Sequence, residues 1–322
     1  MKILLIGLGS MGSNHYRVLK LLVRNSRNLL IYDNDKLRLN KFLKKINNLE
    51  QEKNLDNLIK LADKVVIATS TSSHLKIILK CIKHNKKIIF VEKPLIKNLN
   101  EAKYLTNIVN KRKIKIFVGL IERFNSSVVS LNEFIINKKI YHFEATRTSK
   151  VNDRNQDIDV VSDLMIHDLD LALQFNGKIQ SISSVGLLKG RSIEFAKVNI
   201  IHKNKSISTL TASRITDKKT RLLNFLCNDC FIEANLLKNE FQVYKNSKLN
   251  ISNKKYKISN IIENVQSNPT EPLLAEMDYF INEFNFKIDK RKIDFGYNYN
   301  LKLLHYCNLI SNQILKCGIK KN

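Results

Sequence analysis

The chain of 322 residues contains no tryptophan, three prolines and nine glycines. Such low proline and glycine contents exclude collagen-like and linker-dominated proteins, which depend on these two residues. No apolar run has the length that crosses a membrane as a helix. The first residues show a strand-like pattern without the basic and apolar regions of a signal peptide. We therefore expect a soluble, cytoplasmic, globular protein with no membrane partner.

Cysteine is also sparse, and its five occurrences are too scattered for a disulfide framework in a chain of this length. Cys227 and Cys230 form a C-x-x-C pattern, but a zinc site would need a second pair of ligands. Asn228 and Asp229 separate two strand-like runs, as the turn of a β-hairpin would. We predict reduced thiols and no bound metal.

Acidic residues are few: 29 Asp and Glu stand against 55 Lys and Arg, and the formal net charge is +26. A charge of this sign can indicate a nucleic-acid partner. The basic residues are spread along the whole chain, however, and aromatic residues do not cluster among them. We therefore expect no nucleic-acid partner and infer that the electric field favours an anionic substrate.

A glycine-rich turn follows the first apolar run of the chain and precedes a helical pattern. Strand, tight turn and helix N-terminus are the context in which the spacing G-x-G-x-x-G binds a dinucleotide rather than only turning the chain. The first glycine allows the turn, the second lets the backbone approach a pyrophosphate, and the third lets the helix pack closely. The candidate cofactor contacts in this loop are Gly7, Gly9, Ser10, Met11 and Gly12.

An acidic residue follows the next strand. Leu29–Tyr32 is a short apolar run, and Asp33 comes about 20 residues after the glycine loop, where a carboxylate accepts hydrogen bonds from the adenosine ribose. A carboxylate there repels a 2′-phosphate, so the sequence favours NAD over NADP. Lys36 and Arg38 lie close enough for a phosphate to be tolerated.

Two further strand ends carry polar side chains. Thr69 and Ser70 follow an apolar run and precede a helix that we expect to begin at His74, so all three are candidates for the cofactor site. Another apolar run ends in Glu92-Lys93-Pro94. Ligands of open α/β sheets bind at this carboxyl edge, and a proline after Lys93 would hold the ammonium group in place.

These alternating strands and helices predict an α/β fold with an N-terminal Rossmann domain, a doubly wound parallel sheet of five or six strands, over residues 1–121. From about residue 179 to 256 successive strands with turn residues predict a mostly antiparallel open sheet. We assign this sheet to a C-terminal α+β domain, residues 122–322. The Lys- and Asn-rich segment Asn246–Lys257 is expected to be a solvated edge or loop, and the last helices to pack back onto a domain face.

The stretch Asp157–Leu171 places Asp163 four residues before His167, and so on one face of a helix. Taken alone, this pair could serve as an acid and base, hold a metal ion, or form a salt link with the neighbouring Asp168 and Asp170.

Together these motifs resemble the Gfo/Idh/MocA oxidoreductases in order and spacing over essentially the whole chain. The resemblance implies NAD or NADP as cofactor, with Lys93, Asp163 and His167 around the nicotinamide and the sugar carbon and with Glu92 among the cofactor contacts. It also implies that the C-terminal domain binds the substrate and that its open sheet mediates oligomerisation. The wording Ile121-Glu-Arg-Phe-Asn125 looks like that of the nucleotide-sugar branch, the UDP-N-acetylglucosamine 3-dehydrogenases.

The chemistry expected is oxidation of a secondary alcohol of a sugar, such as UDP-N-acetylglucosamine at C3. His167 would accept the proton, Lys93 would stabilise the alkoxide, and Asp163 would orient the imidazole or bind a sugar hydroxyl. The side chains expected to hold the substrate, mainly its diphosphate, are Arg123, Asn125, Arg147 and Arg154. Alternatives are an inositol or free-sugar dehydrogenase and a non-catalytic regulator that binds the cofactor. A homodimer or homotetramer is expected.

Overall fold

The computed structural model describes residues 1–45, 51–86, 88–150, 158–190, 192–252, 255–282 and 296–320. The chain forms two compact units. Unit 1 contains Met1–Ile121 and Glu271–Leu304, and unit 2 contains Glu122–Thr270 and His305–Asn322. In the part of the chain that is described, no helix combines the length and apolarity needed to cross a membrane.

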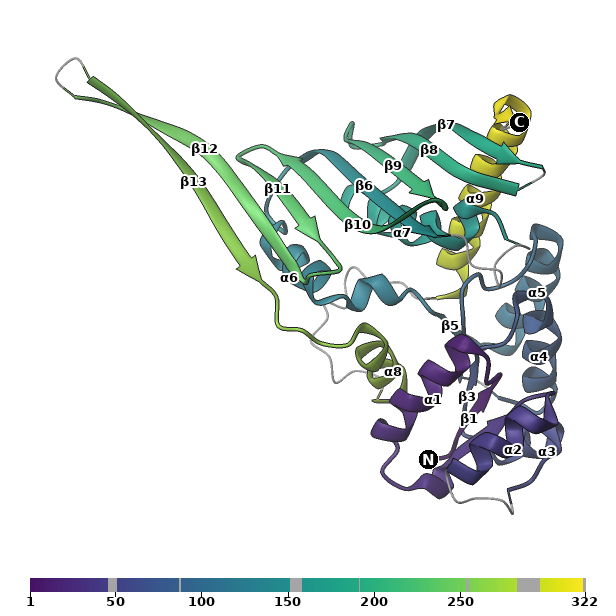
Figure 1. Ribbon diagram of the computed structural model, residues 1–322. Coiled ribbons are helices and arrows are strands. Elements are labelled where there is room, and N and C mark those ends of the chain that lie inside the picture. Colours follow the sequence, from purple (N-terminus) through teal and green to yellow (C-terminus); the bar gives the residue numbers. More distant parts are fainter. Residues whose placement is uncertain are drawn as a thin grey trace. The chain divides into compact units, whose positions relative to one another are not determined.

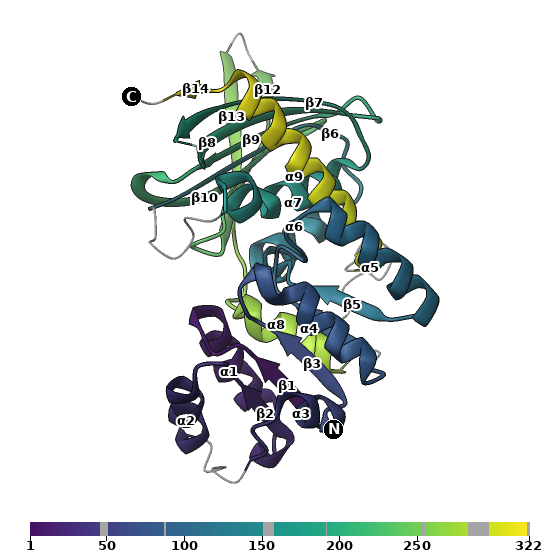
Figure 2. The ribbon, with the colours of Figure 1, turned by 90° about the vertical axis from the view of Figure 1, so that its right-hand side faces the viewer.

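Unit 1 is built on a five-stranded parallel sheet of order β2-β1-β3-β4-β5, with helices on both faces (Figures 1 and 2). The predicted Rossmann sheet is thus confirmed, with five strands. Its strands are β1 Ile3–Ile6, β2 Leu29–Tyr32, β3 Lys64–Ile67, β4 Ile88–Val91 and β5 Lys115–Val118. Its helices are α1 Ser10–Leu22, η1 Ser26–Asn28, α2 Lys36–Lys45, α3 Leu55–Leu61, α4 Thr71–Lys83, α5 Leu99–Arg112 and α8 Pro272–Asn282.

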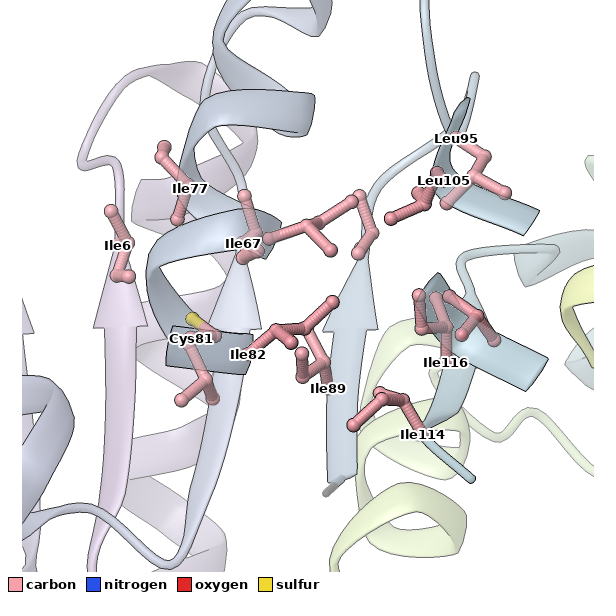
Figure 3. Packing of buried hydrophobic residues seen from close by; sticks show 14 of the residues in the cluster. Ile6, Ile67, Ile77, Cys81, Ile82, Ile89, Leu95, Leu105, Ile114 and Ile116 are labelled. Carbon is pink, nitrogen blue, oxygen red and sulfur yellow. The ribbon is translucent and has the colours of Figure 1, made fainter. Parts of the chain in front are cut away.

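Both faces of this sheet are buried because successive side chains of a strand point in opposite directions. Leu4 and Ile6 of β1 join a core with α3, α4 and α5, part of which Figure 3 shows around Ile67. Ile3 and Leu5 join a second core with α1, α2 and α8. The strand order reverses between β1 and β3, and in such sheets ligands bind beyond the carboxyl ends of the strands at this reversal.

Unit 2 is organised around a nine-stranded sheet of order β13-β12-β11-β10-β6-β9-β8-β7-β14. Neighbours are antiparallel except for β6 with β9 and β7 with β14, so the predicted mostly antiparallel sheet is confirmed. Its strands are β6 Ile140–Lys150, β7 Ile179–Lys189, β8 Ser192–His202, β9 Ile207–Ser213, β10 Ile215–Cys227, β11 Cys230–Asn235, β12 Glu240–Ser252, β13 Lys255–Gln266 and β14 Ile319–Lys320.

Helices of unit 2 cover one face of this sheet. They are η2 Ile121–Phe124, which begins at the last residue of unit 1, α6 Ser126–Phe134, the π-helical turn η4 Val161–Met165 and α7 Ile166–Asn176. Phe175 of α7 packs against Phe143 of β6 and Phe225 of β10, with ring centroids 5.6 and 5.0 Å away. Helix α9, Tyr297–Cys317, belongs to unit 1 up to Leu304 and to unit 2 from His305.

Two hairpins test the turn predictions. Strand β10 ends at Cys227 and β11 begins at Cys230, so the predicted turn at Asn228 and Asp229 is confirmed. The segment Asn246–Lys257 was expected to be either an edge of the sheet or a loop. The edge is found, and the loop is wrong. Apart from residues 253 and 254, which are not described, its backbone lies in the paired strands β12 and β13, and β13 forms the edge of the sheet (Figure 1).

Candidate functional site

The glycine loop of unit 1 is shaped by close backbone packing. Gly7 has φ +95°, and a Cβ added to it would lie 2.7 Å from the carbonyl oxygen of Ala68. At Gly12 an added Cβ would lie 1.9 Å from the carbonyl oxygen of Gly7. At Gly9, the N-cap of α1, it would meet no described atom within 4 Å. The loop therefore requires Gly7 and Gly12 for its own packing. Gly9 instead leaves space at the helix N-terminus, which a bound pyrophosphate needs.

The carboxylate of Asp33 is anchored beside this loop. Its Oδ2 accepts a hydrogen bond from the backbone N–H of Leu8 at 2.7 Å, and its Oδ1 accepts one from Asp35 at 2.8 Å. Arg38 lies 3.3 Å from Oδ2. A carboxylate has about four acceptor positions, so Asp33 retains capacity for a ribose hydroxyl. Fixed in this orientation, it fits the dinucleotide that the glycine loop accommodates.

Four other candidates for the cofactor site lie at the loop and at the end of β3. Ser10 and Met11 form the first exposed turn of α1. Thr69 follows β3, and Ser70 is the N-cap of α4, which begins at Thr71 and not at the expected His74. Their hydroxyl and backbone N–H groups surround the carboxyl end of the sheet within unit 1.

His74 does not fit a cofactor contact. Its ring is fully buried, with Nδ1 3.1 Å from the carbonyl oxygen of Pro94 and Nε2 3.2 Å from that of Thr69. Burial lowers the pKa of His74, although these backbone carbonyls oppose the shift. We therefore correct the prediction: His74 ties two loops of unit 1 together instead of facing a ligand.

The Glu92-Lys93-Pro94 segment directly follows β4, and the Lys93–Pro94 peptide bond is cis. Glu92 is buried and its Oε1 lies 2.5 Å from Nε2 of His15 on α1. Lys93 is half-buried. The lysine is thus held at the carboxyl end of a central strand, where its ammonium group can act on a ligand of unit 1.

In unit 2 the candidate acid and base lie on one continuous run of helix. Asp163 is in the π-helical turn η4 and His167 is in the first turn of α7, and each residue is 8% exposed. Arg214, between β9 and β10, lies 3.8 Å from the Asp163 carboxylate and 3.3 Å from that of Glu194. Asp163 therefore lies close to a guanidinium group that also forms an ion pair with Glu194 of the sheet.

Two of the three arginines expected to bind a diphosphate form ion pairs inside unit 2. Arg123 forms two hydrogen bonds to Asp170, and both side chains are 1% exposed. Arg147 binds Asp168 at 2.7 Å and Glu122 at 2.8 Å, and all three side chains are at most 4% exposed. Because carboxylates occupy these guanidinium groups away from solvent, the expected diphosphate contacts of Arg123 and Arg147 are corrected to internal ion pairs.

Asn125 is also structural. Its side chain caps α6 by accepting a hydrogen bond from Ser127 N–H and donates one to the carbonyl of Leu236 at 3.1 Å. It is 4% exposed, so the expected substrate contact is corrected as well. Arg154, the last of the predicted diphosphate ligands, lies outside the described residues.

The sequence does not identify three buried titratable residues near these candidates: His15, Glu276 and Arg214. His15 stands three residues after Gly12, and Glu276 is a lone acidic residue on the buried side of α8. Each interrupts an apolar pattern, which is the signal that could have identified it. Their partners are distant in sequence and carry no local signal.

Residues 1–120 match the model of an oxidoreductase family with an NAD-binding Rossmann fold. The UDP-N-acetylglucosamine 3-dehydrogenase of Acidithiobacillus ferrooxidans is 28% identical over 192 residues, 59% of this chain and 61% of that protein. The myo-inositol 2-dehydrogenase of Thermotoga maritima is 28% identical over 195 residues, 55% of each chain. The chain thus aligns with less than two thirds of the length of these curated relatives.

The fold extends further than the sequence alignments. The solved structure of the Acidithiobacillus ferrooxidans UDP-N-acetylglucosamine 3-dehydrogenase superposes with a TM-score of 0.81 at 22% identity and covers 98% of both chains. An oxidoreductase from Agrobacterium radiobacter, solved with NAD⁺, L-tartaric acid and magnesium, has a TM-score of 0.75 at 18% identity, covering 97% of this chain and 96% of that one. The first 120 residues thus match the Gfo/Idh/MocA oxidoreductase family model, and the chain as a whole shares the fold of these solved structures.

Proposed function

We propose that this protein is an NAD-dependent dehydrogenase that oxidises a secondary alcohol of a sugar, with a nucleotide sugar such as UDP-N-acetylglucosamine, at C3, as the first candidate substrate. The observation that carries the proposal is the arrangement of the glycine loop and Asp33 at the carboxyl end of the sheet in unit 1. There Gly9 leaves space at the N-terminus of α1, and Asp33 is fixed beside it by the backbone of Leu8. This arrangement suits the pyrophosphate and ribose of NAD.

The cofactor would be held by the glycine loop, by Asp33 and by the hydroxyl groups at the end of β3. When bound, NAD supplies the nicotinamide that accepts a hydride from the alcohol carbon. Unit 1 contributes the Lys93 ammonium, which would hydrogen-bond the substrate oxygen and stabilise the negative charge that develops on it.

The proton of the alcohol requires a base, and His167 is our candidate because an imidazole can exchange a proton near neutral pH. Asp163 would orient this imidazole or bind a neighbouring hydroxyl, and the Arg214 guanidinium lies 3.8 Å from its carboxylate. In this proposal His167 is the base, Lys93 the partner of the oxyanion and Asp163 the orienting anion.

The substrate is supported by the curated relative named UDP-N-acetylglucosamine 3-dehydrogenase and by the fold of its solved structure. Two other relatives are named myo-inositol 2-dehydrogenase and scyllo-inositol 2-dehydrogenase (NAD(+)), the latter 33% identical over 132 residues. An inositol is therefore the second candidate substrate. NADH formation from UDP-N-acetylglucosamine, N-acetylglucosamine and myo-inositol, with the product mass of any sugar that reacts, distinguishes these possibilities.

The roles of Lys93 and His167 are tested by substitution. Lys93→Ala and His167→Ala are each expected to lower turnover by at least about 100-fold while NAD binding, measured by calorimetry, persists. Lys97→Ala is the matched control, because Lys97 is exposed and follows Lys93 by four residues. Near-normal turnover in both active-site variants would exclude this mechanism, and tight NAD binding without turnover on any sugar would favour a regulator.

A further inference from the structure

A buried ion pair joins the first helix of unit 1 to the segment that carries Lys93. His15 on α1 is 0% exposed, and its Nε2 lies 2.5 Å from Oε1 of Glu92. The two residues are 77 positions apart in the sequence. The other carboxylate oxygen of Glu92 accepts a hydrogen bond from the backbone N–H of Lys93 at 3.2 Å. Glu92 is therefore fixed between His15 and the backbone of the lysine.

Burial and charge act on Glu92 in opposite directions. Burial by itself raises its pKa, but the hydrogen bond and charge of His15, together with the charge of Lys93, bring the pKa below its ordinary value. Glu92 is thus a buried anion, and its attraction to the Lys93 ammonium acts equally on both groups.

Two other titratable groups interact electrostatically with Glu92, and burial favours the neutral form of each. Glu276 on α8 has a pKa raised well above its ordinary value by burial and by the charge of Glu92. His74 on α4 has a pKa lowered by burial, against the opposing charge of Glu92. Of these three described side chains, His15 is the one within hydrogen-bond distance of the Glu92 carboxylate.

We propose that His15 is a positioning residue for Lys93: its hydrogen bond holds the Glu92 carboxylate beside the lysine, and that carboxylate in turn holds the Lys93 ammonium group in place. This inference rests on the proposed catalytic role of Lys93. His15 does not touch the substrate; it acts only through Glu92.

The pH profile of turnover tests this chain of contacts. In His15→Leu the carboxylate loses its partner, so burial dominates and Glu92 binds a proton at higher pH than before. We expect kcat/KM to fall by about tenfold or more near neutral pH. A rise of one unit in the pKa of Glu92 lowers its ionised fraction about tenfold when the pH is below that pKa. As pH rises and Glu92 ionises, kcat/KM should recover toward the wild-type value.

Three further variants separate this role from packing. His15→Gln retains a hydrogen-bond donor near the position of Nε2, so its kcat/KM should fall less than that of His15→Leu near neutral pH. Glu92→Gln has no carboxyl to ionise, so its activity should be low at every pH. His74→Gln removes a second buried histidine of unit 1, on α4, whose partners are backbone carbonyls. It should lower stability without causing a loss of activity on the acid side of the pH profile. A His15→Leu profile parallel to the wild type, or a fully active Glu92→Gln, would overturn the proposal.

A measurement without substrate distinguishes this inference from the proposed function. Lys93 is half-buried and accessible to a small acylating anhydride, and its modification is read by peptide mass spectrometry. At one fixed pH, Lys93 should be acylated several-fold faster in His15→Leu and Glu92→Gln than in the wild type or His74→Gln. If this difference appears but the wild type oxidises no sugar, only the proposed function fails. If the wild type is active but the rates are equal, the present inference fails.

Discussion

A guanidinium and a carboxylate buried together stabilise each other only as a pair. Arg123 and Asp170 meet by two hydrogen bonds at a site where each side chain is 1% exposed. Transferring either charge from water costs several kcal/mol by itself, and the partner offsets this cost. The pair therefore contributes to a defined arrangement of η2 against α7, and it cannot exchange its partner for a substrate phosphate without leaving Asp170 buried and unpaired.

We predict that Arg123→Leu lowers the free energy of unfolding by about 3–5 kcal/mol, because it removes one partner of a buried ion pair. Arg221→Ala is the matched control: this arginine contacts Glu122 from a side chain that is 35% exposed, and its loss should cost about 0–1 kcal/mol. The double variant Arg123→Leu/Asp170→Leu should recover part of the loss. Urea unfolding measures all three. A stable Arg123→Leu protein whose only defect is a raised KM for a nucleotide sugar would show that the corrected assignment is itself wrong.

The same residues show where sequence reasoning stopped. The sequence identifies Lys93, Asp163 and His167 as candidate site residues, because they occur in motifs with recognisable spacings. The burial of Arg123 was not, because its partner Asp170 is 47 positions away and the contact depends on how α7 packs on the sheet. Surface and interior arginines look alike until that packing is known.

At the scale of elements, the glycine loop combines two different requirements. Gly12 meets the carbonyl of Gly7 because α1 begins immediately beside the end of β1, so this glycine serves the fold. A Cβ added to Gly9 would meet no described atom within 4 Å, and under the proposed function this open space serves the ligand. The sequence pattern contains both without separating them.

We predict different defects for the two glycines. Gly12→Ala should lower the melting temperature and abolish NAD binding, because its Cβ would lie 1.9 Å from a backbone oxygen and α1 would have to move. Gly9→Ala should leave the melting temperature within a few degrees of the wild type but weaken NAD binding by at least about tenfold. Thermal unfolding and calorimetry measure the two effects. Equal melting temperatures for both variants would contradict this division of roles.

The sequence predicts short elements that have a strong local pattern. It does not predict how far the strands of the second sheet extend. Strand β2 begins and ends at the residues expected, because both its ends carry turn signals and its interior is apolar. Strands β12 and β13 continue through a Lys- and Asn-rich segment because pairing with a neighbour satisfies their backbone groups, whatever the side chains prefer.

At the scale of the whole molecule, charge is the property that composition determines most directly. A formal charge of +26 over 322 residues produces a positive potential that attracts anions before any specific contact forms. Because Arg123 and Arg147 are paired with buried carboxylates, the diphosphate of the substrate proposed above would be attracted more by this distributed field than by these two arginines.

The field makes the proposed substrate class testable through ionic strength. At saturating NAD, kcat/KM for UDP-N-acetylglucosamine should fall by about tenfold between roughly 0.01 and 0.15 M salt, because the screening length shrinks from about 30 to about 8 Å. For uncharged myo-inositol it should stay within about twofold over the same range, because no long-range attraction is lost. Steady-state NADH formation, with viscosity held constant, measures both. An equal fall for the two substrates would place the salt effect on the protein or on NAD binding, and the positive charge would then have no part in selecting an anionic sugar.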